Sequence, residues 1–179
     1  NTCDVRFHPN ENLYSIKTKQ IAIHSKLIGK HNRINIMAAI AIGEAIDIPC
    51  NVIKESLEGH VKISGRLEVK RLKKDIVLID DSYNANPSSM MRAIDVLAEY
   101  KSNKILVIGD MAELGNFAIK HHKDLAKYIL EKKIDVVFGV GKMTKLTIDI
   151  LGDIGRWYAS NSDLTIDLEK LLEKECIVL

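Results

Sequence analysis

The sequence is poor in cysteine, proline, tryptophan and net charge. Its 179 residues include three cysteines, three prolines and one tryptophan, and the formal net charge is only +2. The cysteines, Cys3, Cys50 and Cys176, are too far apart for a disulfide framework or a CxxC metal half-site, which favours a reducing cytoplasm. So weak a charge gives no broad basic field, and we expect neither nucleic acid nor a membrane surface as a partner.

Long apolar segments are also missing. The longest run, residues 36–42, ends at Gly43 and is far shorter than the ~20 residues of a membrane-spanning helix. The chain opens with neither an initiator methionine nor a basic leader followed by an apolar stretch, and its last residues read as a buried strand with no turn after it. We therefore expect a piece of a longer protein.

The composition that remains, 46% hydrophobic and 28% charged, is that of an ordinary globular protein. Residues 1–28 carry short alternating segments, which predict antiparallel strands. Residues 35–46 are apolar on nearly every side at helical spacing, which predicts a buried helix. A second short helix is expected over 52–59, with Asn51 as its N-cap.

Beyond Gly65, buried strands alternate with amphipathic helices. Apolar runs at 76–79, 105–108, 136–140 and 177–179 are separated by stretches long enough for parallel crossovers. Helices are expected from Pro87, capped by Asn86, and near 117–132, 142–151 and 163–173. The predicted fold class is therefore α/β, a doubly wound domain with a parallel sheet.

Polar residues follow the first two of these strands. Residues 80–87 read Asp-Asp-Ser-Tyr-Asn-Ala-Asn-Pro, and residues 109–115 read Gly-Asp-Met-Ala-Glu-Leu-Gly. Open α/β sheets bind ligands at the carboxyl ends of their strands, where a carboxylate can accept ribose hydroxyls and a helix start favours phosphate. The alternative is a turn with a helix cap at 80–87, and an Asp110 that only satisfies loop amides.

Other polar residues are weaker candidates. Asn32 and Asn35 can hydrogen-bond the edge of a flat heterocycle, or merely begin a helix, and Arg66 can reach a phosphate or be an ordinary surface residue. His121 and His122 have no partner at metal-ligand spacing, and His122 is expected in the core. No GxxxxGK[ST] loop or GxSxG elbow occurs, so the chain cannot complete triphosphate chemistry by itself.

Taken together, residues 29–35, Gly65-Arg66, 80–90 and 109–115 resemble the Mur ligases, in the order in which that family carries these motifs. The string at 80–87 resembles the branch that adds D-alanyl-D-alanine. The resemblance implies three domains. Of these, the chain would hold the end of the central ATP-binding domain, 1–63, and most of a C-terminal Rossmann-like ligase domain, 64–179.

The activity implied by the resemblance is ATP- and Mg²⁺-dependent amide ligation in peptidoglycan precursor synthesis. The terminal carboxylate of UDP-N-acetylmuramoyl-tripeptide would be phosphorylated, and the amine of D-Ala-D-Ala would attack the acyl phosphate. The family's P-loop lysine, Mg²⁺ ligands and modified lysine lie outside this chain. We therefore expect no catalytic residue and no metal ligand within it, and no activity from the chain alone.

The resemblance assigns six residues to the nucleotide: Asn32, Asn35, Arg66, Asp81, Tyr83 and Asn84. Asp81 would hold the ribose hydroxyls, and Arg66 would reach the nucleotide from the start of the second domain. Tyr83 and Asn84 would border the nucleotide, and the two asparagines of the first domain would face the adenine or ribose.

The dipeptide end would be lined by Asn86 and Asp110. Two other functions stay open. The chain could be a non-catalytic nucleotide-binding module of the same fold, or part of a ligase like folylpolyglutamate synthetase, which also closes a Rossmann-like domain on ATP. Residues 80–87 argue against the second of these.

Overall fold

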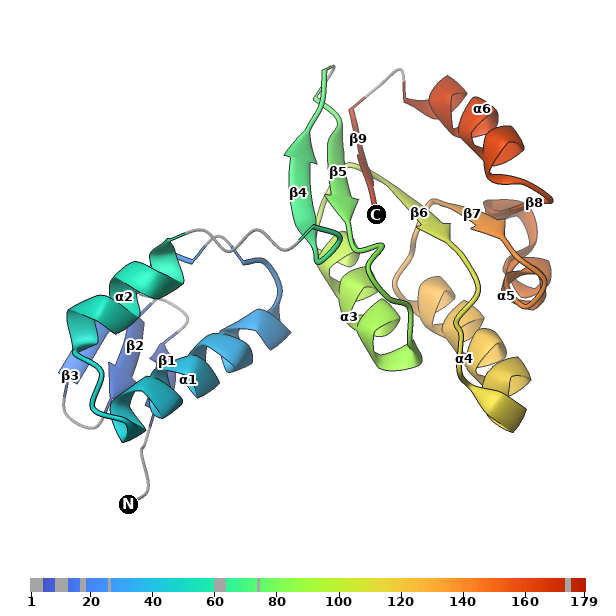
Figure 1. Ribbon diagram of the computed structural model, residues 1–179. Helices are drawn as coiled ribbons and strands as arrows, with labels where there is room; N and C mark the ends of the chain where they lie inside the picture. The colour runs from blue at the N-terminus through green and yellow to red at the C-terminus, as the bar shows by residue number, and fades with distance from the viewer. Residues whose placement is uncertain are drawn as a thin grey trace. The chain divides into compact units, whose positions relative to one another are not determined.

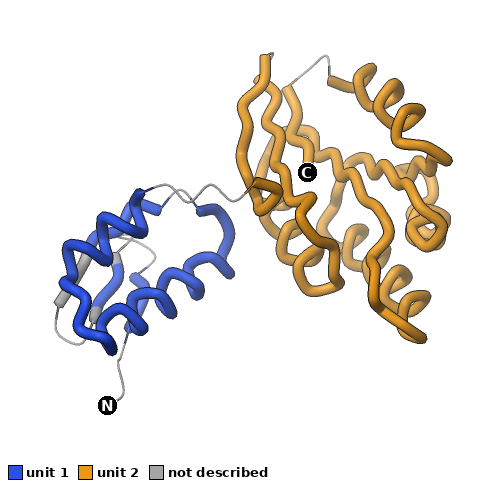
Figure 2. Tube along the Cα trace, in the orientation of Figure 1, with its two compact units in different colours: residues 1–62 blue, residues 63–179 orange. Residues whose placement is uncertain are grey.

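The computed structural model describes residues 5–8, 13–16, 19–25, 27–59, 64–73, 75–172 and 175–179. The chain divides into an N-terminal unit, residues 1–62, and a C-terminal unit, residues 63–179 (Figure 2). Among the described residues, no helix is long and apolar enough to cross a membrane.

The N-terminal unit combines a three-stranded antiparallel sheet with two helices. Strands β1 (Val5–His8), β2 (Leu13–Ile16) and β3 (Lys19–Ala22) pair in chain order, as the alternating pattern predicted. The helices are α1 (Lys30–Ala45) and α2 (Cys50–Glu58). The unit's core consists of Tyr14, Ile23, Ile36, Ile40 and Ile53.

The prediction that α1 is buried nearly all round is wrong for this structure. Ile36 and Ile40 are buried, but Ile34 and Ile42 are 66 and 63% exposed, and Ile46, directly after the helix, is 64% exposed. The reason is geometric, since α1 packs against β1, β2 and α2, and these elements cover one face of the helix.

The prediction that Asn51 caps α2 is also wrong. The helix begins at Cys50, Pro49 occupies the cap position, and no side chain accepts a capping hydrogen bond. Pro49 has φ −57° and ψ 138°, the non-helical backbone usual at a cap, so the helical conformation starts at Cys50 and Asn51 lies inside the helix.

The C-terminal unit is built on a six-stranded sheet with the order β4-β5-β9-β6-β7-β8 (Figure 1). Its strands are β4 (Glu68–Arg71), β5 (Val77–Asp80), β6 (Asn103–Ile108), β7 (Val136–Val140), β8 (Gly155–Tyr158) and β9 (Cys176–Val178). All pairs are parallel except β4 with β5. The apolar runs predicted β5, β6, β7 and β9, whereas β4 and β8, the two polar edge strands, were not predicted.

Four helices cover this sheet: α3 (Pro87–Ala98), α4 (Ala118–Glu131), α5 (Thr144–Leu151) and α6 (Asn161–Leu171). Helix α3 packs against α4 and α4 against α5, while α6 packs on β7 and β8 (Figure 1). Right-handed crossovers place α3, α4 and α5 on one face and α6 on the other, because the chain reverses direction across the sheet between β8 and β9. The predicted α/β class with a mostly parallel sheet is confirmed.

Candidate functional site

The carboxyl ends of β5, β6 and β7 meet at one edge of the sheet, because these strands run parallel. Both polar segments predicted from the sequence begin at this edge, the turn 81–86 after β5 and the loop 109–114 after β6. Strand β9 lies between β5 and β6. The two segments therefore leave strands that are not neighbours, and each has its own set of contacts.

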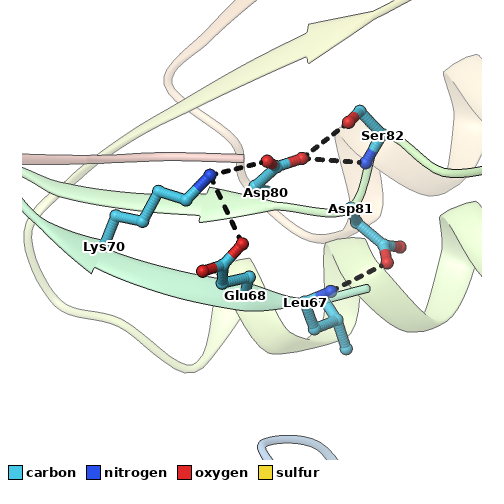
Figure 3. A network of polar contacts seen from close by, with 6 residues as sticks. All are labelled: Leu67, Glu68, Lys70, Asp80, Asp81 and Ser82. Atoms are coloured by element: carbon cyan, nitrogen blue, oxygen red, sulfur yellow. Dashed lines mark hydrogen bonds and ion pairs between the residues drawn. The ribbon is translucent and has the colours of Figure 1, made fainter. Parts of the chain in front are cut away.

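The turn after β5 is tied to the residues that precede β4. Leu67 N–H donates to Asp81 Oδ1 at 3.0 Å (Figure 3), and Tyr83 N–H donates to the Gly65 carbonyl oxygen at 3.0 Å. Gly65 has φ +72°, and a Cβ atom there would lie 2.9 Å from the Tyr83 nitrogen. Only glycine fits this conformation and this approach without strain. The segments 65–67 and 81–83 are therefore held side by side.

Arg66 and Tyr83 meet within this paired structure. The Cζ atom of Arg66 lies 4.2 Å from the centroid of the Tyr83 ring, within the range of a cation–π contact. Both residues are exposed, Tyr83 to 65%. Three of the six residues predicted for the nucleotide, Arg66, Asp81 and Tyr83, are thus brought together at the end of β5.

Asp80, the last residue of β5, belongs to a network within the scaffold of the turn (Figure 3). Its Oδ1 accepts from Ser82 Oγ at 2.6 Å and from Ser82 N–H at 3.2 Å, and its Oδ2 accepts from Lys70 Nζ at 2.9 Å. The ammonium group of Lys70 also lies 3.4 Å from Glu68. The hydrogen bonds from Ser82, followed by that from Lys70, lower the pKa of Asp80 to about 2. Asp80 is therefore ionised at neutral pH, and it fixes the start of the turn that carries Asp81.

Farther along the turn, the asparagines differ in their contacts. Asn84 is exposed. Asn86 Oδ1 accepts from Ser89 N–H at 2.9 Å, and Asn86 N–H donates to Ser89 Oγ at 3.2 Å, which forms a capping box at the start of α3. The predicted cap with Pro87 at the first helical position is confirmed. The role of Asn86 at the dipeptide stays a prediction.

In the loop after β6, Asp110 contacts the start of α5. Its Oδ1 accepts from Thr144 N–H at 2.7 Å and from Thr144 Oγ1 at 2.8 Å. Burial raises the pKa of Asp110, but the bonds from Thr144 and from the Met143 backbone outweigh it and leave the pKa below its usual value. Gly141 has φ +118°, and a Cβ atom there would collide with the Asp110 carboxylate. Asp110, in the loop after β6, therefore caps the start of α5.

His122 is fully buried behind the same loop, as the sequence predicted. Met111 N–H donates to His122 Nε2 at 3.4 Å, so this nitrogen carries no proton. Nδ1 lies 3.3 Å from Thr147 Oγ1, and that hydroxyl donates to the His122 carbonyl oxygen at 2.9 Å. These contacts assign the proton to Nδ1 of a neutral ring, and burial, which disfavours the charged form, lowers the pKa of His122.

The remaining predicted residues lie on α1 in the N-terminal unit. Asn32 Nδ2 donates to the Ile28 carbonyl oxygen at 2.7 Å, and Asn35 Nδ2 donates to Asn32 Oδ1 at 3.2 Å. The two amides therefore form a pair one helical turn apart, with Asn35 exposed. Within the described parts of both units, no three His, Cys, Asp or Glu residues lie together so as to hold a metal ion.

The sheet order and the polar turns at its carboxyl edge define a Rossmann-like α/β domain. Residues 65–179 match the family described as "Mur ligase, glutamate ligase domain". The chain belongs to this family of ligases.

Curated relatives of the chain include two enzymes named UDP-N-acetylmuramoyl-tripeptide–D-alanyl-D-alanine ligase. The one from Buchnera aphidicola subsp. Baizongia pistaciae is 36% identical over 161 residues, covering 89% of this chain and 35% of the relative. The one from Escherichia coli K12 is 32% identical over 174 residues, covering 97% of this chain and 38% of the relative. A crystal structure of MurF from Acinetobacter baumannii superposes with a TM-score of 0.80 at 26% identity, covering 98% of this chain and 39% of that one. The chain thus spans little more than a third of the length of these relatives.

Proposed function

We propose that the chain is the C-terminal part of a ligase that adds D-Ala-D-Ala to UDP-N-acetylmuramoyl-tripeptide, with ATP as the energy source, in the cytoplasm. The names of the relatives and the polar string at 80–87 support this proposal. The observation that carries it is the grouping of Arg66, Asp81 and Tyr83 at the end of β5. A guanidinium, a carboxylate and a ring at such a position suit a nucleotide.

The chemistry we propose forms one amide bond at the expense of ATP. The terminal carboxylate of the tripeptide takes the γ-phosphoryl group of ATP, and ADP leaves. The amine of the dipeptide then displaces phosphate from the resulting acyl phosphate and loses a proton as the amide bond forms. Mg²⁺ would neutralise charge on the phosphates, with ligands expected outside this chain. Because three ligands must be placed together, the contribution of the C-terminal unit is positioning and charge stabilisation.

Asp81 is the proposed contact to the ribose hydroxyls. The bond from Leu67 N–H fixes the orientation of its carboxylate, and a carboxylate can accept several hydrogen bonds at once. Arg66 is the proposed contact to the phosphates, since a guanidinium presents several N–H donors in one plane.

The other assignments remain predictions. Asn32, Asn35 and Asn84 are proposed to lie near the base and ribose in the complete enzyme. Asn86 and Asp110 are proposed for the dipeptide side, in addition to the capping contacts that each already makes.

The test is kinetic and uses the complete ligase. We expect D81A to raise the KM for ATP about tenfold, or about 1.4 kcal/mol of binding, and to change the KM for D-Ala-D-Ala far less. D81N keeps an oxygen that can accept from Leu67 N–H, so it removes the charge of Asp81 without removing the hydrogen bond that holds the turn. D153A, at an exposed aspartate of the short 3-10 turn Gly152–Ile154, is the control. An unchanged KM for ATP in D81A would remove Asp81 from the nucleotide site.

The choice of acceptor distinguishes the competing functions. Turnover that requires both the muramoyl tripeptide and D-Ala-D-Ala supports the proposal. Turnover with a folate and glutamate would favour the other ligase, and nucleotide binding without any turnover would favour a binding module. The purified 179-residue chain should be inactive under all of these conditions.

A further inference from the structure

Arg66 is an exposed arginine whose backbone is fixed on both sides. Gly65 before it and Leu67 after it have φ values of +72° and +48°. The Gly65 carbonyl oxygen accepts from Tyr83 N–H at 3.0 Å, and Leu67 N–H donates to Asp81 at 3.0 Å. The Leu67 side chain is buried, which anchors the segment in the unit. The Cα atom of Arg66 is therefore held in place over the turn that follows β5.

The Arg66 side chain is held by the same turn. Its Cζ atom lies 4.2 Å from the centroid of the Tyr83 ring, so the ring supports the guanidinium. A free arginine loses the freedom of four torsions when it binds a ligand, and a contact made beforehand reduces this entropic cost. A guanidinium stacked on a ring still presents its N–H groups at its edge, where a phosphate can accept them.

This arrangement leaves Tyr83 in a different role from the one its sequence position suggested. The guanidinium occupies one face of the ring, and that face is closed to a base. Tyr83 donates its backbone N–H to Gly65 and supports Arg66 with its ring, so both of these contacts act on the segment that carries the guanidinium.

We propose that Tyr83 is a positioning residue, which holds the Arg66 guanidinium ready for the phosphate groups of a nucleotide and does not itself stack on the base. The inference rests on the proposed function and adds a selectivity to it. The site then binds nucleoside di- and triphosphates more tightly than the corresponding nucleoside, because the Arg66 guanidinium contacts the phosphates.

The first experiment is a double-mutant cycle in the complete ligase. We expect Y83L to raise the KM for ATP about three- to tenfold with little change in kcat, and Y83F, which keeps the ring, to recover most of that loss. In an R66A background, Y83L should add nothing. F117L, at a ring of matching exposure, 63%, is the control. An equal rise in KM from Y83L with and without Arg66 would overturn the inference, because Tyr83 would then contact the nucleotide directly.

The second experiment needs no catalysis. In NMR spectra of the 179-residue chain, the Arg66 Cδ protons should be shifted upfield by the Tyr83 ring. The shift should disappear in Y83L and persist in Y83F. Random-coil shifts for these protons in the wild type would overturn the inference. Because this readout is independent of turnover, an inactive complete protein would contradict the proposed function alone and leave the positioning role open to this direct test.

Discussion

Two polar segments leave the same edge of the sheet in the C-terminal unit, and they use their polar groups in opposite ways. The turn after β5 is held by its backbone and by the preceding Asp80, and its Tyr83 and the adjacent Arg66 are exposed. The loop after β6 bonds to helix α5, because Asp110 accepts a hydrogen bond from Thr144 N–H. The fully buried His122 lies behind the loop.

The difference teaches that polar composition at a strand end does not identify a ligand site by itself. Both segments contain carboxylates next to a buried strand. In the turn, the internal hydrogen bonds hold exposed groups in place, which preorganises them for a ligand. In the loop, the bonds join β6 to α5, which stabilises the fold. If the loop is mainly structural, substitutions in the loop should lower stability more than substitutions at the turn.

The largest effect is expected from His122. H122A leaves a cavity and deprives Met111 N–H of its acceptor, so we expect the free energy of unfolding to fall by about 3 kcal/mol. Denaturant unfolding of the chain, followed by circular dichroism, measures this loss. H121A, at the adjacent and partly exposed histidine, should change it by less than about 0.5 kcal/mol. Similar results for both variants would mean that the loop does not depend on the buried ring.

A smaller loss is expected for Asp110. D110A removes the acceptor for Thr144 N–H and Oγ1 at the start of α5, which should cost about 1–2 kcal/mol, and D110N should lose less because it keeps one oxygen. The KM for D-Ala-D-Ala of the same variants, measured in the complete ligase, tests whether Asp110 also contacts the dipeptide. If D110A unfolds like the wild type, the capping contact does not stabilise the fold, and the contrast between loop and turn fails. A raised KM for D-Ala-D-Ala in D110A would support the proposed place of Asp110 on the dipeptide side, in addition to its cap.

The smallest effect concerns Asp80 and is pH-dependent. The pKa of Asp80 is about 2 in the folded chain against 3.8 as the ordinary value, so its contribution is fully present above about pH 4 and is lost as the pH falls towards 2. We expect about 1 kcal/mol, since the ion pair with Lys70 is partly screened by solvent. D80N should flatten the stability profile between pH 4 and 2, and an identical slope in both proteins would contradict the role of Asp80 in the turn.

Much of the fold could be predicted because its signals are local. The apolar runs of β5, β6, β7 and β9 and the Asn86 cap each depend on a few adjacent residues. Strand β8 was missed because it is a short edge strand in which Arg156 and the exposed Trp157 break the apolar pattern. Its place is set by distant partners, since β8 pairs with β7 and Trp157 Nε1–H donates to the Gly141 carbonyl oxygen at 2.9 Å.

In the candidate site, too, the sequence predicted the residues, and contacts between distant segments set their arrangement. Motif resemblance named Arg66, Asp81 and Tyr83 from the sequence. It did not show that Leu67 N–H orients Asp81 or that the Tyr83 ring supports Arg66. These contacts join residues on either side of the β4–β5 hairpin, so they exist only once that hairpin has formed.

By itself, the sequence determined where the main strands and helices lie, where α3 begins, and which polar residues stand at the ends of strands. Those properties follow from hydrophobic period and capping chemistry, which act over a few residues. The tertiary structure decided which partner each of those polar residues meets. Asp110 and Asp81 follow similar strands, but one meets Thr144 of α5 and the other Leu67 of the hairpin. The partner depends on which segments the sheet order and the hairpin bring together, and no local pattern encodes that order.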